Sequence, residues 1–346
     1  MTRRVLTGMR TTGKLHLGHY VGALERWKEI QDLKDYECFF LLADTQALTT
    51  HSENPELLIE SVRDVVLDWL SVGLDPGLPH VHFVQQSQVT ERYELSGLLM
   101  MIAKYAEVMR NPTLKSELEG QESATMGFMS YPVDQAADIY MVSPTPFQRN
   151  DELLVPVGED QVPHLEYSKV LAQRFNKMYC SDRKKSKVFV PCTALVGRVG
   201  RLVGIDGQSK MSKSLNNAIY LADDATTVTA KVRRMFTDPN RTRPYIPGNT
   251  DDTNPVFMYH RAFNPNKLEV DDLTSRYQQG KVGDVEVKQL LAKAINAFLD
   301  PIREKRSKFE NTDISEIVIA GTEVAKLACK PVIEAVRERM SLVYPK

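Results

Sequence analysis

The chain has 346 residues, of which 42% are hydrophobic and 26% are charged, as expected for an ordinary globular protein of more than one average domain. A net charge of −1 gives no overall attraction to nucleic acid. Because no stretch approaches 18 uninterrupted apolar residues, we expect neither secretion nor a membrane partner. The four cysteines form no C-x-x-C pair, which favours reduced thiols in a cytoplasmic protein over disulfides or a zinc site.

The N-terminal part alternates short apolar runs with helical patterns. The predicted elements are a strand at 3–8, a helix from about His16 to 33, a strand at 36–44, a helix at 51–76 and a strand at 80–87. In the second helix Asn54 can serve as the cap, Pro55 suits the first turn and Gly73 suits the C-terminal exit. This alternation indicates an α/β fold with a parallel sheet, whose ligands bind at the carboxyl ends of the strands.

Beyond about residue 215 the strand patterns fade. Residues 282–310 and 314–340 are helical in pattern, and 246–255 predict a long polar loop. We therefore place a C-terminal α-helical domain at 216–346, after an α/β domain at 1–215. Basic clusters at 232–243 and 301–308 could follow a phosphate backbone, although such clusters are more often solvated faces.

The run "HLGH" sets His16 and His19 three residues apart around a glycine. A metal site would need further ligands at fixed spacing, and the sequence offers no H-E-x-x-H and no Cys/His cluster nearby. Two half-buried structural histidines are one alternative. The other is a phosphate site, in which a helix N-terminus and imidazole donors face phosphoryl oxygens and Gly18 leaves room for a base or ribose.

A second motif strengthens the phosphate interpretation. The run "KMSKS" places Lys210 and Lys213 three residues apart, downstream of Gly204 and Gly207. Lysine is a point charge on a flexible stem and can follow a phosphate that moves during a reaction. A loop of Lys and Ser alone is usually exposed to solvent, and it is the pairing with H-x-G-H that points to nucleotide chemistry.

These two motifs resemble the two signatures of class I aminoacyl-tRNA synthetases. The runs "YPVDQAADI" (131–139), "VPVGEDQVPHLEYSKVLAQRFN" (155–176) and "MFTDP" (235–239) narrow the resemblance to the tryptophanyl-tRNA synthetases, over nearly the whole chain. The resemblance implies a Rossmann-like, doubly wound catalytic domain and a helical domain that binds the tRNA anticodon. It also implies a homodimer, with ATP, L-tryptophan and tRNA(Trp) as substrates.

The resemblance also implies site residues. The catalytic groups would be His16, His19, Lys210 and Lys213. The ATP site would comprise Arg10, Thr11, Thr12, Gly18, His19, Gly158, Glu159, Asp160, Leu202, Lys210, Met211, Ser212, Lys213 and Ser214. Leu202 would contact the adenine through its backbone. Magnesium would arrive with ATP, because no protein metal site is visible. On pattern alone Asp160 could instead be a helix N-cap, with Pro163 in the first turn.

The implied tryptophan pocket comprises Asp138, Tyr131, Gln135, Ile139, Val155, Val157, Gln161 and Gln46. Asp138 is the expected acceptor for the indole N–H. Ile139, Val155 and Val157 could equally be core residues. Departures from the commoner family pattern are Arg10–Thr12 in place of Gln-Pro-Ser, Gln46 in place of histidine and Gln135 in place of methionine. Segment 142–152 is longer than usual, and we expect it beside the pocket.

The implied reaction forms tryptophanyl-adenylate and pyrophosphate, then transfers tryptophan to the tRNA. The Tyr131, Gln135 and Asp138 arrangement also occurs in the tyrosine enzymes, so tyrosine remains the alternative substrate. A small-molecule nucleotidyltransferase would use H-x-G-H without the late KMSKS. A non-charging paralogue would be expected to have lost one of the two motifs, and both are intact here.

Overall fold

The structure is a computed structural model that describes residues 2–119, 124–181, 186–197, 202–207, 211 and 215–344. Its described strands form a parallel sheet in the order β3-β2-β1-β4-β5. The strands are β1 (Arg3–Arg10), β2 (Glu37–Ala43), β3 (Val81–Gln85), β4 (Glu152–Val157) and β5 (Cys192–Val196). The predicted doubly wound α/β fold is confirmed.

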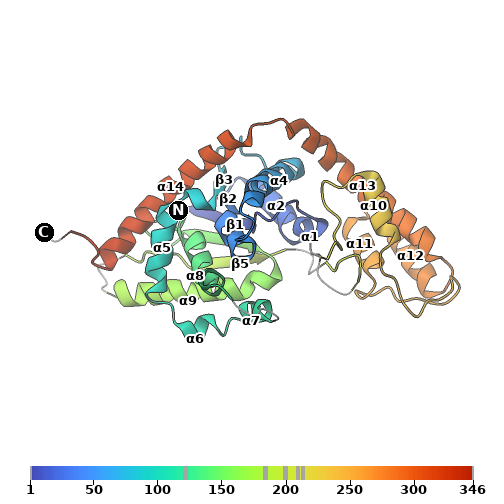
Figure 1. Ribbon diagram of the computed structural model, residues 1–346, viewed down its shortest axis with the longest axis horizontal. Helices are drawn as coiled ribbons and strands as arrows, with labels where there is room; N and C mark the ends of the chain where they lie inside the picture. Colours follow the sequence, from blue (N-terminus) through green and yellow to red (C-terminus); the bar gives the residue numbers. More distant parts are fainter. Residues whose placement is uncertain are drawn as a thin grey trace.

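Helices cover both faces of the sheet (Figure 1). They are α2 (Glu25–Leu33) and α4 (Glu56–Val72) on one face, and α5 (Glu91–Met100), α8 (Met126–Tyr140) and α9 (Val162–Tyr179) on the other. Successive β2 side chains point to opposite faces. Phe40 stacks on Trp27 of α2 with ring centroids 5.2 Å apart, whereas Phe39 packs in the core formed with α8 and α9. Both faces of the strand are therefore apolar, as a buried parallel sheet requires.

Shorter elements connect these layers. They are α1 (Leu17–His19), the π-helix η1 (Tyr20–Leu24), α3 (Asp44–His51), the 3-10 helix η2 (Gln86–Gln88), α6 (Tyr105–Val108), α7 (Pro112–Leu118) and the 3-10 helix η3 (Glu159–Gln161). Helix α4 ends as predicted, with Gly73 left-handed at a φ of 97°. Its start differs slightly, because Pro55 is itself the cap residue and the Asn54 side chain makes no capping bond. Within the described residues no helix is long and apolar enough to cross a membrane.

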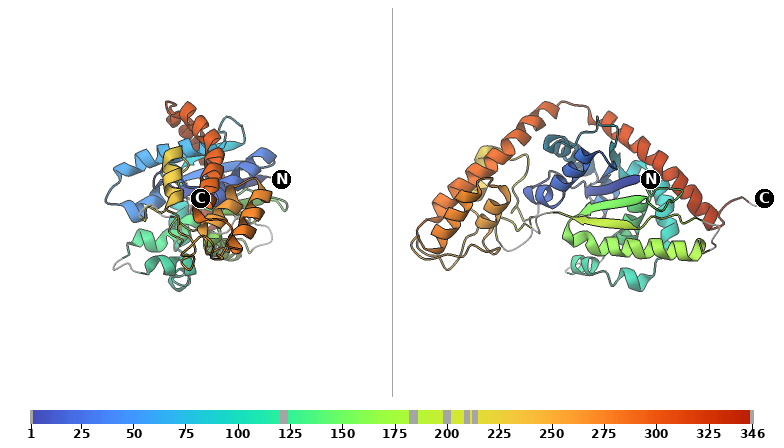
Figure 2. Two further views of the ribbon diagram at one scale, coloured as in Figure 1. Left: turned by 90° about the vertical axis from the view of Figure 1, so that its right-hand side faces the viewer. Right: turned by 180° about the vertical axis from the view of Figure 1, so that it is seen from behind.

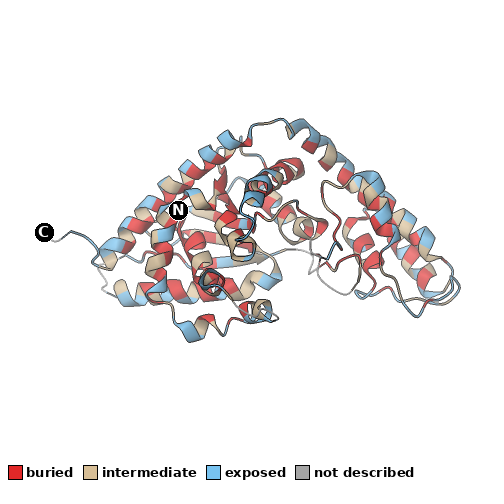
Figure 3. Ribbon diagram, in the orientation of Figure 1, coloured by how far each residue is buried: buried red, intermediate tan, exposed pale blue. Residues whose placement is uncertain are grey.

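The chain beyond 215 is helical, as predicted. The helices are α10 (Ala225–Arg233), α11 (Pro255–Phe263), α12 (Lys267–Gln278), α13 (Asp284–Phe309) and α14 (Ile314–Arg339). Helices α10 to α13 gather beside the sheet, whereas α14 runs back across it (Figures 1 and 2). Buried and exposed positions alternate along both long helices, as expected for helices with one packed face (Figure 3).

Helix α14 covers β3, the strand at one edge of the sheet. Gly321 lies so close to the Phe83 backbone that a Cβ atom there would overlap it. One residue further along, Thr322 Oγ1 accepts a 3.0 Å hydrogen bond from the Gln85 backbone N–H. The last helix of the chain therefore packs on the α/β part, which the sequence pattern alone did not indicate. A division between two domains at residue 215 remains a prediction.

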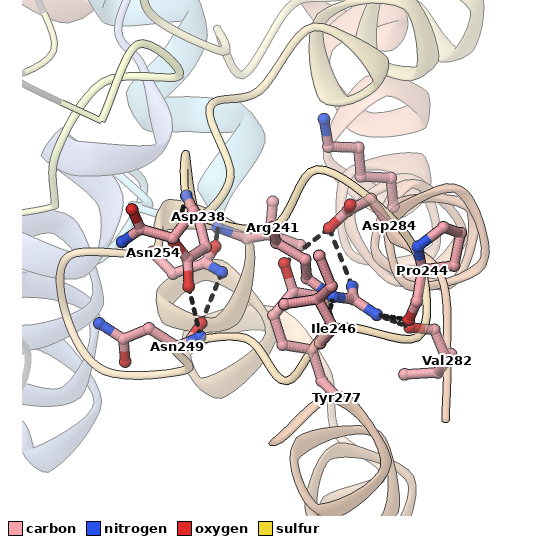
Figure 4. A network of polar contacts seen from close by, with 12 residues as sticks. Asp238, Arg241, Pro244, Ile246, Asn249, Asn254, Tyr277, Val282 and Asp284 are labelled. Carbon is pink, nitrogen blue, oxygen red and sulfur yellow. Dashed lines mark hydrogen bonds and ion pairs between the residues drawn. The ribbon is translucent and has the colours of Figure 1, made fainter. Parts of the chain in front are cut away.

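The predicted polar loop between α10 and α11 is organised by Arg241 (Figure 4). The Arg241 guanidinium donates to the carbonyls of Ile246, Pro244 and Val282 and lies 3.9 Å from the centroid of the Tyr277 ring. Since the Arg241 side chain is buried, it is unavailable to a phosphate backbone. Part of the basic cluster at 232–243 is thus structural.

Candidate active site

The strands β1 and β4 separate toward their carboxyl ends. They pair only between Arg3–Val5 and Glu152–Leu154, whereas β1 pairs with β2 along Arg4–Arg10. Nearer the carboxyl ends of the two strands, Thr7 Oγ1 donates a 2.5 Å hydrogen bond to the Pro156 carbonyl. The strand order also reverses between β1 and β4. In doubly wound sheets this switch point forms the ligand crevice.

The predicted ATP residues come from both sides of this crevice. Arg10 ends β1 and is followed by Thr11 and Thr12, while Gly158 follows β4 and leads into η3. Arg10, Glu159 and Asp160 are exposed. The Thr11 side chain is fully buried, and its hydroxyl has no hydrogen-bond partner within the described residues. Two segments distant in sequence are therefore brought to one crevice.

The H-L-G-H segment opens helix α1. His16 is the extended N-cap residue, and its backbone N–H donates a 3.1 Å hydrogen bond to His19 Nδ1. The two imidazoles stack with centroids 3.7 Å apart. Because Nδ1 of His19 accepts this bond, the proton of a neutral ring lies on Nε2. His19 Nε2 is then a donor that could face a phosphoryl oxygen.

The two sequence motifs meet at Gly18. A Cβ atom on Gly18 would lie 3.1 Å from the Met211 Sδ-methyl carbon and 3.1 Å from the His16 ring. Met211 is 6% exposed and shares a core cluster with Leu202, Leu15 and Leu17. Any side chain at Gly18 would push on Met211 or on His16. The glycine thus fits a close approach between the H-x-G-H and K-M-S-K-S motifs.

The segment that follows K-M-S-K-S is also fixed to H-L-G-H. Leu17 donates to the Ile219 carbonyl and Leu221 donates to the Leu15 carbonyl, each at 2.9 Å through its backbone N–H. His16 and Tyr220 form the antiparallel bridge between these bonds. Lys210, Ser212, Lys213 and Ser214 lie outside the described residues, and their roles remain predictions.

The segment after β4 leads directly into α9. Gly158 approaches Asp160 closely, since a Cβ atom on Gly158 would lie 2.8 Å from Asp160 Oδ1. Gln161 is the residue that precedes α9, and Pro163 occupies its first turn. Asp160 is therefore not the helix cap that pattern alone allowed. Its carbonyl accepts a 2.9 Å hydrogen bond from Thr113 Oγ1, which attaches α7 to this side of the crevice.

Asp138 lies in a buried polar network. Its Oδ2 accepts a 2.7 Å hydrogen bond from Gln86 Nε2, and its Oδ1 lies 2.6 Å from Arg92 Nε. Arg92 also pairs with Asp134 at 2.5 Å. Burial raises the pKa of Asp138, and the Arg92 guanidinium opposes this rise. The Arg92 contact is not aligned as a hydrogen bond, so Oδ1 accepts none within the described residues.

Tyr131 belongs to a second buried network. Its hydroxyl donates to Glu117 at 2.8 Å and accepts from His164 Nε2 at 2.9 Å, while His164 Nδ1 accepts from Asn111 at 3.1 Å. This arrangement requires the neutral Nε2–H tautomer. Burial lowers the pKa of His164 to about 4, so the imidazole remains neutral at pH 7. Tyr131 is thereby held in one orientation.

The remaining predicted pocket residues differ in exposure. Ile139 and Val155 are 1% and 3% exposed and belong to the core on the α8 and α9 face, and Val157 is half-buried against it. Gln135 Nε2 lies 3.5 Å from Gln161 Oε1. Gln46 donates its backbone N–H to Gln86 Oε1 at 3.2 Å. That Ile139, Val155 and Val157 contact a ligand, and do not serve only as core residues, remains a prediction.

Among the described residues, no group of three or more His, Cys, Asp or Glu side chains could hold a metal ion.

The family of class I tRNA synthetases for W and Y (tryptophan and tyrosine) matches residues 2–300. The chain belongs to this family. Curated tryptophan–tRNA ligases from Chlamydia caviae and Borreliella burgdorferi are 40% and 42% identical to it, covering 98% and 99% of this chain and 96% and 95% of theirs.

Solved structures agree with this assignment. The synthetase resembles the tryptophanyl-tRNA synthetase of Campylobacter jejuni complexed with ADP and tryptophan, with a TM-score of 0.79 and 28% identity over 98% of this chain and 99% of that one. The tyrosyl-tRNA synthetase of Archaeoglobus fulgidus shares the fold, with a TM-score of 0.65 and 20% identity over 88% and 90% of the two chains.

Three residues that contact the predicted pocket residues of this synthetase were not predicted from its sequence. They are Gln86, which orients Asp138, Arg92, which pairs with it, and His164, which holds Tyr131. The run of polar residues at the carboxyl end of β3 could have indicated Gln86, because ligands of such sheets bind there. Nothing local marks Arg92 or His164, since their partners come from other elements.

The expected position of segment 142–152 was wrong. This segment joins α8 to the amino end of β4, where Glu152 pairs with Arg3 at the start of β1. Arg4 Nη1 donates to the Val142 carbonyl at 3.2 Å, and Asp151 accepts from the Thr2 backbone. The segment therefore lies at the opposite end of the strands from the crevice. Sequence proximity to the pocket helix misled the prediction.

Proposed function

We propose that this synthetase is a tryptophan–tRNA ligase that activates L-tryptophan with ATP and transfers it to tRNA(Trp). The contact between Gly18 and Met211 at the crevice is the observation that carries the nucleotide chemistry. Curated relatives at 40% and 42% identity over nearly the whole chain favour tryptophan over tyrosine.

In the first step a carboxylate oxygen of tryptophan attacks the α-phosphorus of Mg·ATP. A new P–O bond forms, the bond to the β-phosphate breaks, and pyrophosphate leaves. In the second step the 2′-hydroxyl at the 3′ end of the tRNA attacks the carbonyl of the adenylate, loses its proton, and AMP departs. No protein nucleophile is required, so the enzyme acts by positioning and charge neutralisation.

The charge-neutralising groups in this proposal are His16, His19, Lys210 and Lys213. The Nε2–H of His19 supports its role as a charge-neutralising group, because a hydrogen-bond donor can stabilise negative charge without transferring a proton. Mg²⁺ enters as part of the ATP substrate and contacts the phosphates. Arg10 to Thr12 and Gly158 to Asp160 would bind the rest of the nucleotide.

Asp138 would accept the indole N–H through Oδ1, the oxygen that accepts no hydrogen bond within the described residues. A carboxylate has about four acceptor positions, so the bond to Gln86 leaves room for the indole. A substrate without an N–H would leave this buried oxygen with its Arg92 ion pair but without a hydrogen bond from the substrate, which supports rejection of phenylalanine.

The tRNA anticodon would bind the helical region after 215. An exposed pair there supports this: Tyr245 is 64% exposed, and Arg243 Nη1 donates to its hydroxyl at 2.9 Å. Arginine and tyrosine side chains are suited to stacking on unpaired bases. Nearby, the bonds of Arg241 keep the loop fixed.

We further propose a cytoplasmic homodimer. The side chains of Met101, which directly follows α5, and Tyr105, which begins α6, are each 75% exposed and offer apolar surface for a second copy. Light scattering of the purified protein would give about twice the chain mass of 39.2 kDa if the dimer forms.

The deciding experiment is ATP–pyrophosphate exchange with each amino acid, followed by charging of tRNA(Trp). We expect exchange with tryptophan and much less with tyrosine or phenylalanine. Exchange with tyrosine of equal efficiency would overturn the substrate assignment. Exchange without charging would instead support a non-charging paralogue.

A further inference from the structure

A buried carboxylate on α4 contacts the backbone directly before the first catalytic histidine. Asp68 is fully buried, and its Oδ2 accepts a 2.7 Å hydrogen bond from the Leu15 N–H. Leu15 precedes His16. The position of this amide therefore depends on the position of the Asp68 side chain.

The other oxygen of Asp68 is held from the helical region. Asp68 Oδ1 accepts a hydrogen bond from Arg306 Nη1 of α13, and Arg306 Nη2 donates to Asp64 Oδ1 at 2.8 Å. Burial raises the pKa of Asp68 to about 6, while the charge of Arg306 and the Leu15 N–H oppose this rise. Asp64 is 27% exposed, and among the described residues the Leu15 N–H bonds to Asp68 and not to Asp64. The two carboxylates share an arginine but only one reaches the H-x-G-H segment.

Helix α13 also holds the opposite side of this segment. The segment 219–221 that bonds to Leu15 and Leu17 is fixed by Asp223, whose Oδ2 accepts from the Tyr220 N–H at 2.8 Å. Arg303 Nε donates to the Asp223 carbonyl at 2.7 Å. Arg303 and Arg306 are three residues apart and so share one face of α13. One helix thus fixes both supports of the first catalytic histidine.

We propose that Asp68 is a positioning residue for His16, and that Arg306 of α13 keeps Asp68 in place for amino-acid activation. This inference depends on the proposed function, because it assigns His16 a role in adenylate formation. A small displacement of a phosphate-facing group is costly to the rate, since a shift of about 1 Å can lower it about 100-fold. The activation step is therefore sensitive to a contact made on a helix outside the α/β part.

The test compares Asp68→Asn with Asp64→Asn at about pH 8, where Asp68 is ionised. Asp68→Asn removes the buried negative charge that pairs with Arg306. Asp64→Asn removes the partly exposed negative charge that pairs with the same arginine. We expect Asp68→Asn to lower kcat for pyrophosphate exchange at least about 10-fold. Asp64→Asn should change it less than about twofold. Tryptophan binding, measured by equilibrium dialysis without ATP, should be unchanged in both.

A double-mutant cycle identifies the route. If Arg306 acts through Asp68, adding Arg306→Gln to Asp68→Asn should cause little further loss in kcat. Additive losses, or equal effects of Asp68→Asn and Asp64→Asn, would overturn the proposal, as would loss of tryptophan binding in Asp68→Asn.

If Asp68→Asn does not fold, Arg306→Lys decides, because lysine keeps the charge without the fork that bonds two carboxylates. A kcat below that of Asp64→Asn supports the proposal and an equal kcat refutes it. Absence of exchange in the wild-type protein with every amino acid would refute the proposed function instead.

Discussion

The crevice has two sides that are built differently. The proposed nucleotide side consists of residues 10–12, 16–19 and 158–160, each a short run of neighbours in the chain. The proposed amino-acid side consists of Asp138 and Tyr131 with their partners Gln86, Arg92 and His164, which come from different elements. The first side combines glycines with side chains from its own short runs, whereas the second consists of buried charges and amides from several elements. The first can therefore be recognised in a sequence, whereas the partners of Asp138 and Tyr131 on the second become visible only in the fold.

The largest expected effect concerns the nucleotide side. Replacing Lys210 or Lys213 by Ala should lower kcat for pyrophosphate exchange by about 100-fold or more, with a smaller change in the ATP KM, because these charges act mainly on the transition state. Steady-state kinetics would measure both constants. Lys330→Ala, on the exposed face of α14, is the control. A change confined to KM in both variants would contradict this role.

On the amino-acid side, His164 predicts a pH-dependent stability. Its pKa is about 4 in the folded protein, below the ordinary value of 6.5, so the unfolded chain binds more protons between these values. Stability should therefore fall as pH decreases from about 6.5 to 4, by up to about 3 kcal/mol. Urea unfolding at several pH values would show it.

The variant His164→Gln should lose this slope, while His51→Gln, at the end of α3, should keep it. An unchanged slope in His164→Gln would mean that other groups cause the acid sensitivity.

A third prediction tests the charge of Asp138. Asp138→Asn should reduce kcat/KM for tryptophan by about 1.5–3 kcal/mol, the range for hydrogen bonds to charged groups, with little change in ATP affinity. Asp134→Asn is the matched control, because Asp134 pairs with the same Arg92 from the same helix but is more exposed. Equal losses in both variants would assign the effect to Arg92 rather than to the indole.

The smallest effect is expected outside the crevice. The double variant Arg243→Ala/Tyr245→Ala should raise the tRNA KM by about 10-fold, since base stacking on an aromatic contributes about 1–3 kcal/mol. Pyrophosphate exchange should not change. Tyr344→Ala, which removes another exposed tyrosine, should leave charging intact. Unchanged charging in the double variant would exclude this loop from tRNA binding.

Sequence reasoning predicted the sheet and the long helices, because strand runs and helical periodicity are local. The nucleotide side, which rests on equally local glycine-containing motifs, stays a prediction. Sequence reasoning could not predict Arg92, because an arginine in a helix gives no sign of which carboxylate it will pair with. It also misplaced segment 142–152, since the chain leaves α8 near the pocket yet enters β4 at the far end of the sheet. Arg241 shows the same limit, because a cluster of basic residues does not reveal which one is buried.

The close packing of Gly321 against Phe83 also matters while the protein is being made. β3 stands at one edge of the sheet, and its outer side is covered by α14, which is synthesised after all the other described helices and strands. Until residues 314–339 have been synthesised, the sheet has an open edge that can pair with other chains. Messages truncated before α14 should therefore yield aggregation-prone chains even though they encode every predicted catalytic residue.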